Sequence, residues 1–330
     1  MRVLRTTPAN GATSVSGTAS ITVLLSAPTA AATAMPSISP SVPGRWSGAG
    51  TAALTFTPAE PFVPMSTVTV TVAGGPRGVR SASGSTVATS VSSSYTVEGG
   101  SVLRIQQLLA LLDYSPLVFT PSAPEPPAGD VAAQLAAAYV PPPGTFAWRS
   151  HGWPAQLAAM WQPGTYSVMT RGLVMSFQAD HGLLVNGEIT AGLWNDLFAA
   201  LAAGEANTGG YNFALGDKTP PETLTIWHDG TVVLHSEANT GISQSPTADG
   251  VFPVFARYRN QVMRGKNPDG SSYADPVQYV AYFNGGDAVH YLGRADYGIP
   301  QSLGCIELPL AAAATGWPYL AYGTLVDVIG

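Results

Sequence analysis

The sequence Gln301-Ser302-Leu303-Gly304-Cys305-Ile306-Glu307-Leu308 contains the only cysteine of the 330 residues, directly after a glycine. A lone thiol cannot form an internal disulfide, and in a chain of secreted-type composition it is a candidate reactive group. The nearest histidine is His290, upstream of the cysteine. We therefore expect Cys305 and His290 to be the nucleophile and base of an acyl-transfer site. The competing interpretation is a buried, inert cysteine, because free cysteine is among the most buried residue types, and composition alone favours it.

The composition around this segment indicates a loop-rich, β-rich chain of the extracellular type. Only 10% of the residues are charged, 45% are hydrophobic, and the chain has 36 glycines and 28 prolines. A length of 330 residues predicts two or three domains. The net charge of -6, with only 14 Lys and Arg residues, leaves no basic stripe for phosphates. Nucleic acids and anionic membrane surfaces are therefore not expected as partners.

The start of the sequence, Met1 to Pro8, has no apolar segment of the kind found in secretion signals. No later window approaches the roughly 18 apolar residues of a membrane-spanning helix. We expect the secretion signal or anchor of this protein to be absent from the sequence as it stands.

Residues 1–98 are dominated by small and β-branched residues in alternating runs separated by turn formers. Examples are Ser20 to Leu25 and Thr67 to Val72, whose period of two predicts the short strands of a sandwich. Together with Gly44-Arg45-Trp46, these runs resemble bacterial immunoglobulin-like modules of surface proteins. That resemblance implies a spacer or wall-contact domain without chemistry of its own.

Residues 99–206 change to helical periodicity. Helices are predicted at Val102 to Leu112, Val131 to Tyr139, Thr170 to Gly182 and Ala191 to Leu201, with a proline-rich surface excursion between Pro116 and Pro143. The helical runs around Leu103 to Leu109 and Val174 to Leu183 resemble the two halves of the three-helix peptidoglycan-binding domain. The insertion at 116–168 departs from that family and leaves any binding groove undefined.

Residues 207–330 return to strands and predict an all-β domain. The segment Glu222 to Ser236 alternates apolar and polar residues on both sides of a His228-Asp229-Gly230 turn, which predicts a hairpin. Further strands are expected at Gln278 to Phe283, Ala288 to Tyr291 and Gly323 to Ile329. The fold class expected for the whole chain is therefore multidomain and mainly β.

The chemistry of Cys305 requires a base, because the thiolate is the nucleophile and a free thiol has a pKa of about 8.5. An imidazole can accept that proton and return it to a leaving amine. Gly304 lets the backbone approach a substrate carbonyl closely. These features suit acyl transfer.

A longer pattern supports this interpretation. Thr240-Gly241, Pro246-Thr247, Gly250-Val251-Phe252, Val289-His290, Ser302-x-Gly304-Cys305-Ile306-x-Leu308 and Gly323 to Val326 follow each other along residues 207–330. This segment resembles the L,D-transpeptidase (YkuD-type) catalytic domain from end to end. The resemblance implies that a cysteine attacks the peptide bond after the third residue of a peptidoglycan stem tetrapeptide and passes the acyl group to the side-chain amine of a neighbouring stem. It also implies an extracytoplasmic, cell-wall location, stem peptides as partners and carbapenem β-lactams as inhibitors.

The resemblance implies roles for individual residues. Cys305 would be the nucleophile and His290 the base, while Ser302 and Gly304 would shape the cysteine loop and contribute to the oxyanion site. Tyr273 falls near a tyrosine that some members place beside that site. The alternative for Ser302 is a hydroxyl that only caps a turn.

Three positions depart from the family pattern, and we expect them to contact substrate. Leu303 replaces a common histidine, and Tyr291 follows the histidine where glycine or serine is common. Glu307 replaces a common arginine or asparagine. If it faces the pocket, its carboxylate would repel an acidic stem or bind a cation, and near Cys305 it would raise the thiol pKa. The alternative is a solvated strand residue.

Other sites are not expected. His181, His228 and His235 lack metal-ligand spacing and are predicted to be structural, so neither a metal nor another cofactor is expected. No glycine-rich phosphate loop is present. We expect a monomer. Two alternatives to cross-linking remain open, namely a wall-binding protein with a degenerate catalytic domain and an enzyme that gives the thioester to water or a free amino acid.

Overall fold

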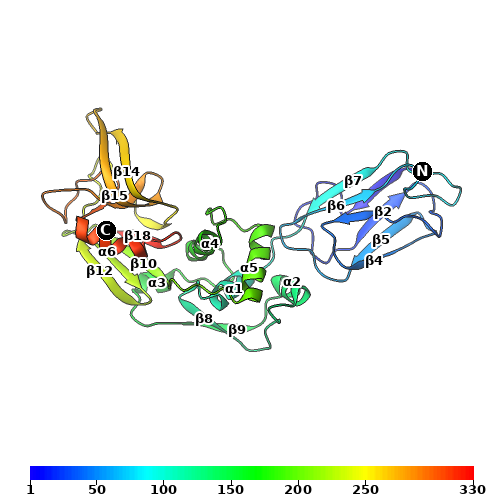
Figure 1. Ribbon diagram of the computed structural model, residues 1–330, viewed down its shortest axis with the longest axis horizontal. Helices are drawn as coiled ribbons and strands as arrows, with labels where there is room; N and C mark the ends of the chain where they lie inside the picture. Colours follow the sequence, from blue (N-terminus) through cyan, green and yellow to red (C-terminus); the bar gives the residue numbers. More distant parts are fainter. The chain divides into compact units, whose positions relative to one another are not determined.

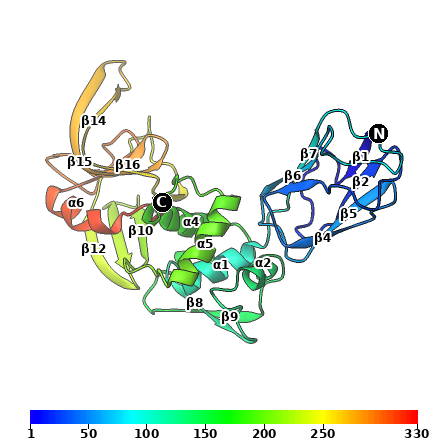
Figure 2. The same ribbon diagram turned by 45° about the vertical axis from the view of Figure 1, so that its right-hand side comes forward.

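The computed structural model describes all 330 residues, and Figures 1 and 2 show the path of the chain from its N-terminus to its C-terminus. The chain forms two compact units, each built from separate segments. The first unit contains residues 1–104, 123–143 and 189–202, and the second contains residues 105–122, 144–188 and 203–330. The middle of the chain, predicted as one helical domain, thus contributes to both. No helix in the chain combines the length and apolarity needed to cross a bilayer.

The N-terminal part of the first unit is a sandwich of two antiparallel sheets, with strand orders β1-β2-β5-β4 and β3-β6-β7. The seven strands are β1 (Val3–Thr7), β2 (Ile21–Leu25), β3 (Ser37–Ser39), β4 (Gly44–Ser47), β5 (Ala53–Pro58), β6 (Thr67–Val72) and β7 (Val91–Thr96). Alternate residues of β2 and β6 are buried, as their sequences predict, and form one core with Phe62 and Tyr95. The predicted immunoglobulin-like sandwich is confirmed.

Residues 123–143, the second segment of this unit, are bonded to the sandwich and to Arg104 near the start of helix α1 (Val102–Leu111). Helix α2 (Val131–Tyr139) begins at Asp130, whose carboxylate accepts the Ala133 N–H, and ends at Tyr139, whose hydroxyl donates to the Phe62 carbonyl. The fully buried Arg104 donates to Glu125 at 3.0 Å and to Gln134 at 3.1 Å. These contacts join residues 123–143 to residues 1–104.

The other predicted helical runs are confirmed within a few residues as α1 (Val102–Leu111), α4 (Val168–Asp180) and α5 (Ala191–Ala203). The short helix α3 (Ala155–Ala159) was not predicted. The insertion at 116–168, of which residues 116–143 were predicted as a proline-rich surface excursion with one short helical run, also contains two paired strands, β8 (Leu117–Pro121) and β9 (Gly144–Trp148). In the second unit, Gly172 of α4 lies so close to the Gly323 carbonyl that a Cβ there would overlap it.

The C-terminal part of the second unit is a second β-sandwich. One sheet has the order β12-β11-β10-β18-β13 and the other β14-β15-β16-β17. Their strands are β10 (Asn212–Asp217), β11 (Thr223–His228), β12 (Thr231–Glu237), β13 (Gly250–Pro253), β14 (Ala256–Lys266), β15 (Ser272–Asn284), β16 (Asp287–Tyr291), β17 (Ile306–Leu308) and β18 (Leu325–Ile329). One short helix, α6 (Leu310–Gly316), and a 3-10 turn at Trp317–Tyr319 precede β18.

The core of this sandwich explains which strand faces are apolar. Both sheets contribute fully buried side chains to one cluster, among them Ile226 and Val326 from the first sheet and Ala281 and Ile306 from the second. The predicted hairpin turn is confirmed, because Asp229 and Gly230 have φ angles of 46° and 80° between β11 and β12. The hairpin of β14 and β15 extends beyond the rest of its sheet (Figure 1).

Candidate active site

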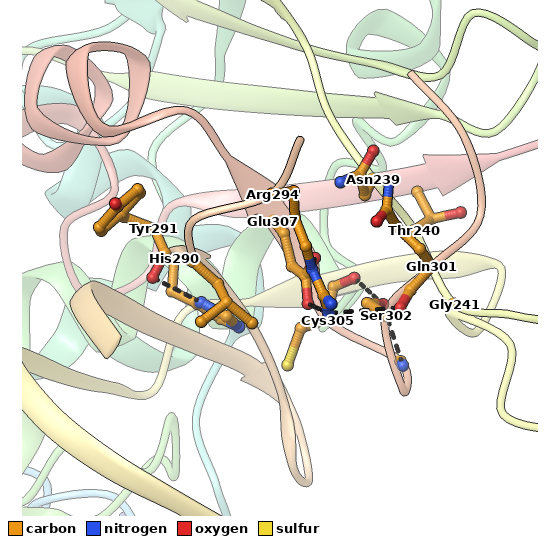
Figure 3. A network of polar contacts seen from close by, with 12 residues as sticks. Asn239, Thr240, Gly241, His290, Tyr291, Arg294, Gln301, Ser302, Cys305 and Glu307 are labelled. Carbon is orange, nitrogen blue, oxygen red and sulfur yellow. Dashed lines mark hydrogen bonds and ion pairs between the residues drawn. The ribbon is translucent and has the colours of Figure 1, made fainter. Parts of the chain in front are cut away.

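The arrangement of β16 and β17 brings Cys305 and His290 to one place. These two strands are parallel neighbours, with His290 opposite Glu307 and Val289 opposite Ile306. Cys305 immediately precedes β17, so the register places it beside β16, near its histidine. Figure 3 shows the sulfur of Cys305 directed away from Ser302, on the side where the His290 ring lies.

Both side chains line a cavity of about 670 Å³, which opens between the β14–β15 hairpin and the loop that leads to β17. The hairpin contributes Tyr273 and Tyr282, and the cysteine loop contributes Leu303. The structure therefore brings together five of the eight predicted site residues at the wall of one cavity, namely Cys305, His290, Tyr273, Leu303 and Glu307.

Ser302 and Gly304 hold the cysteine loop. The hydroxyl of Ser302, which is 1% exposed, donates to the Cys305 carbonyl at 2.6 Å and accepts the Gly304 N–H at 3.2 Å. Gly304 has a φ of 114°, and a Cβ there would overlap Asp287 Oδ1. Because the Gly304 N–H is engaged by Ser302, its role in the loop is conformational, and an oxyanion contact from Ser302 or Gly304 stays a prediction.

The buried carboxylate of Glu222, which the sequence analysis missed, is linked by hydrogen bonds to the cysteine loop. Glu222 is 2% exposed and accepts hydrogen bonds from the Thr240 N–H at 2.6 Å and the Thr240 hydroxyl at 2.8 Å. The Thr240 carbonyl in turn accepts the N–H groups of Gln301 and Ser302, each at 2.9 Å. These hydrogen bonds therefore connect Glu222 through Thr240 to Ser302, whose hydroxyl holds the Cys305 carbonyl.

Glu307 is not a solvated strand residue, so that alternative is wrong. Its side chain is 4% exposed and forms a bidentate ion pair with Arg294, with Nε to Oε2 and Nη2 to Oε1 both at 2.7 Å (Figure 3). Arg294 also donates to the Gln301 carbonyl at 3.3 Å. The cavity wall therefore carries a guanidinium, supplied by Arg294 thirteen positions before Glu307, which sequence analysis did not identify.

The hydrogen bonds of His290 leave one ring nitrogen available as a base. Its Nδ1 lies 3.1 Å from the Tyr291 carbonyl, which can only accept, so Nδ1 carries the proton and Nε2 keeps its lone pair. Burial lowers the pKa of His290, although the Tyr291 carbonyl and the charge of Glu307 oppose that change. The ring is therefore neutral at pH 7.

Cys305 is partly exposed, and its thiol lies 3.8 Å from the Gly286 carbonyl. Desolvation raises the pKa of the thiol to about 12, and the charges of Asp287 and Glu307 contribute in the same direction. The Ala288 backbone opposes this shift. The free protein thus holds a neutral thiol beside a neutral imidazole.

The three other predicted positions differ in placement. Desolvation raises the pKa of Tyr273, and the nearby Cys305 acts in the same direction. The same two causes raise the pKa of Tyr282, which the sequence analysis missed. Leu303 reaches the cavity and its carbonyl accepts a bond from Ser245 Oγ at 3.0 Å. Tyr291 is not brought to the cavity, because its side chain packs against the sandwich core.

The three histidines that were predicted to be structural, His181, His228 and His235, each have a partner in the structure. His228 Nδ1 bonds to Asn212 at 2.9 Å, His235 Nδ1 bonds to Thr225 at 2.8 Å, and His181 stacks on Phe177. No three His, Cys, Asp or Glu side chains converge as they would around a metal ion.

Two family models match the chain. Residues 214–328 match the L,D-transpeptidase catalytic domain, and residues 1–97 match a bacterial Ig-like domain. The first match includes every residue of the cavity described above. None of the curated proteins matches the chain.

Solved structures of similar proteins were also found. An L,D-transpeptidase from Mycobacterium smegmatis is 16% identical, with 100% of this chain and 99% of that chain covered and a TM-score of 0.34. L,D-transpeptidase 3 from Mycobacterium tuberculosis is 14% identical, with 100% and 99% covered and a TM-score of 0.34. The catalytic domain of the E. faecium L,D-transpeptidase, in a form acylated by ertapenem, is 26% identical, with 36% and 98% covered and a TM-score of 0.33.

Proposed function

Because residues 214–328 match the L,D-transpeptidase catalytic domain, we propose that this chain cross-links peptidoglycan stem peptides through a thioester on Cys305. The observation that carries the proposal is the presence of the single thiol and the Nε2 lone pair of His290 in one cavity within that segment. Peptidoglycan, the proposed substrate, lies outside the cytoplasm, so the proposal places the protein in the cell wall.

The proposed reaction has two halves. In acylation, His290 Nε2 takes the thiol proton, and the sulfur attacks the carbonyl carbon of the third residue of a stem tetrapeptide. The tetrahedral intermediate collapses, and the fourth residue leaves as an amine that carries the proton returned by His290. In transfer, the side-chain amine of a neighbouring stem attacks the thioester, His290 takes the amine proton, and the thiol is released.

The test is the mass of the intact protein after incubation with a carbapenem, because the proposed thiolate would be acylated by the β-lactam carbonyl. We expect one drug adduct on the wild type and none on Cys305→Ala. His290→Ala should acylate about 10² to 10⁴ times more slowly. His235→Ala is the matched control, because that histidine is exposed and bonds only to Thr225, and it should react like the wild type.

A second function is favoured by one observation, the raised pKa of the Cys305 thiol in the free protein. A thiol that stays neutral even with substrate would leave a wall-binding protein with a degenerate catalytic domain. A folded wild type that gains no carbapenem mass and forms no product from tetrapeptide muropeptides would establish this alternative.

The fate of the thioester needs a separate measurement. Incubation of purified tetrapeptide muropeptides yields cross-linked dimers if the amine of a second stem is the acceptor. Tripeptides alone would indicate hydrolysis, and tetrapeptides with a newly supplied fourth residue would indicate exchange. We expect dimers to form, and retention of cross-linking by Cys305→Ala would falsify the proposal.

A further inference from the structure

Asp287 is an acidic residue of the catalytic cavity to which the proposed reaction assigns no role. It begins β16 and lines the cavity together with Cys305 and His290. Its carboxylate lies directly against the backbone of Gly304, since a Cβ on that glycine would overlap Oδ1. The neighbouring Gly286 carbonyl is 3.8 Å from Cys305 Sγ. The turn that ends at Asp287 therefore flanks the nucleophile.

This carboxylate has no cationic partner in the structure. Its one side-chain hydrogen bond is a long contact of 3.4 Å from Asn284 Nδ2, and no Lys, Arg or His lies within ion-pair distance. Glu307, another carboxylate of the cavity wall, is in contrast held by both arms of Arg294. Arg264 also lines the cavity from β14, but it is exposed and forms no ion pair with Asp287.

An unpaired carboxylate at this position disfavours the chemistry that the cysteine needs. A negative neighbour disfavours a thiolate, and Asp287 raises the pKa of Cys305. Its own pKa is raised to about 6 by desolvation, so it is mostly ionised at neutral pH despite being half-buried. Such an arrangement becomes favourable when a cation binds at the carboxylate, since the bound charge neutralises it and the thiolate is no longer disfavoured.

We propose that Asp287 binds a primary ammonium group of a stem peptide and holds it beside Cys305. The peptide class rests on the proposed function, while the ammonium site rests on the geometry of Asp287, Gly304 and the thiol. The ammonium belongs either to the acyl donor or to the acyl acceptor, and the two sources have the same chemistry. In either case substrate binding replaces an unfavourable charge next to the nucleophile with a neutral pair.

The first experiment measures the alkylation rate of Cys305 by iodoacetamide, an uncharged reagent, in the absence of substrate. Asp287→Asn keeps the shape and removes the charge, so the thiol pKa falls. Each unit of that fall increases the thiolate about tenfold, so the variant should be alkylated several times faster at pH 7. Asp269→Asn is the matched control, because it removes the same charge from the exposed turn of the β14–β15 hairpin and should change nothing.

The second experiment measures turnover, where the opposite effect is expected. With a tetrapeptide donor that has a free side-chain amine, Asp287→Asn should acylate about tenfold more slowly than the wild type if the donor supplies the ammonium. With the same donor acetylated on that amine, Asp287→Asn should acylate at least as fast as the wild type, because no ammonium is present to offset the Asp287 charge that raises the thiol pKa. If the acceptor supplies the ammonium, acylation is not slowed, and the ratio of cross-linking to hydrolysis falls instead. Transfer to hydroxylamine, which is largely uncharged at neutral pH, is then unaffected.

Faster alkylation together with slower reaction of free-amine peptides supports the site, because a general structural defect would slow both. The proposal is overturned if the variant handles free-amine and acetylated peptides alike in both halves of the reaction, or if alkylation slows. Should the wild type fail to turn over any peptide, the proposed function fails, and protection of Cys305 from iodoacetamide replaces turnover. A free-amine tetrapeptide should then protect the wild type more strongly than Asp287→Asn, and equal protection would overturn the ammonium site.

Discussion

At the scale of single residues, Arg294 compensates for the acidic residue that follows Cys305 by two positions. The carboxylate of Glu307 is almost fully buried, and its charge acts on both Cys305 and His290. Two hydrogen bonds of 2.7 Å from Arg294 satisfy it and oppose its charge. Arg294 also donates to the Gln301 carbonyl and so connects the ion pair to the cysteine loop. A position that departs from the family pattern therefore carries a structural interaction.

Replacing Arg294 with methionine should destabilise the second unit, because it leaves a buried carboxylate without a partner. We expect a loss of up to about 3 kcal/mol, at the lower end for a broken buried pair because Arg294 is one-third exposed. The double variant Arg294→Met with Glu307→Met should recover most of that loss. Urea unfolding monitored by tryptophan fluorescence measures both, and equal stability of the single variant and the wild type would contradict the assignment.

The pH dependence of Cys305 alkylation follows from its raised pKa. Because the thiol pKa is about 12 and burial lowers the pKa of His290, the free protein holds no thiolate–imidazolium pair at neutral pH. The rate of reaction with iodoacetamide should rise continuously from pH 6 to pH 10, as thiolate forms. A plateau that begins near pH 5 would show instead that the ion pair exists before substrate binds.

Much of this site could be predicted from the sequence, since Cys305, His290 and Ser302 lie in a short, spaced motif. Arg294, Glu222 and Asp287 could not. Their roles depend on the path of the loop from β16 to β17 and on the packing of Thr240 against it, which bring together residues that no local period relates. Tyr291 was misplaced because alternation on β16 turns its side chain to the core when His290 faces the cavity.

At the scale of elements, the short loop before β17 sets the position of the thiol. The loop is held by hydrogen bonds from the Ser302 hydroxyl to the Cys305 carbonyl and from the Gly304 N–H to that hydroxyl. The close contact of Gly304 with Asp287 restrains it further. Strands with clear alternation, such as β2, β6 and β11, could be predicted from sequence. The pairing of β8 with β9 and the full length of the β14–β15 hairpin could not, because their sequences are interrupted by proline or are largely exposed and polar.

Gly304→Ala should displace the cysteine loop. The substitution forces a residue with a side chain to adopt a φ of 114° and places a methyl group against Asp287, at a cost of about 1–3 kcal/mol. Carbapenem acylation should fall by more than tenfold, since this displacement moves Sγ relative to His290. Gly270→Ala, with a φ of 86° but open space around it, controls for backbone strain alone and should acylate normally.

At the scale of the whole molecule, the segments of each unit are held together by contacts between residues far apart in sequence. In the first unit, Tyr139 packs on the sandwich core and bonds to Phe62, while Arg104 joins Glu125 and Gln134. The sequence predicted three consecutive domains with boundaries at 98 and 206, and those boundaries stay predictions. The interleaving of segments could not be predicted, because single buried residues such as Arg104 give no periodic pattern.

Tyr139→Ala should therefore weaken the first unit and leave the thiol chemistry intact. We expect one calorimetric transition to shift to lower temperature, corresponding to a loss of up to about 3 kcal/mol of stability, because Tyr139 is only partly buried against the core. Tyr139→Phe removes only the bond to Phe62 and should cost about 1 kcal/mol. The iodoacetamide rate of Cys305 should equal that of the wild type in both variants, and a changed rate would show coupling between the units.

The interleaved path of the chain also determines how the molecule responds to a broken backbone. The chain passes from one unit to the other after residues 104, 122, 143, 188 and 202. A protease cut at any one of these crossings leaves fragments that share a folded unit, so they stay associated until that unit is denatured. Several covalent connections in parallel also divide any pulling force between the units, whereas one linker would carry all of it.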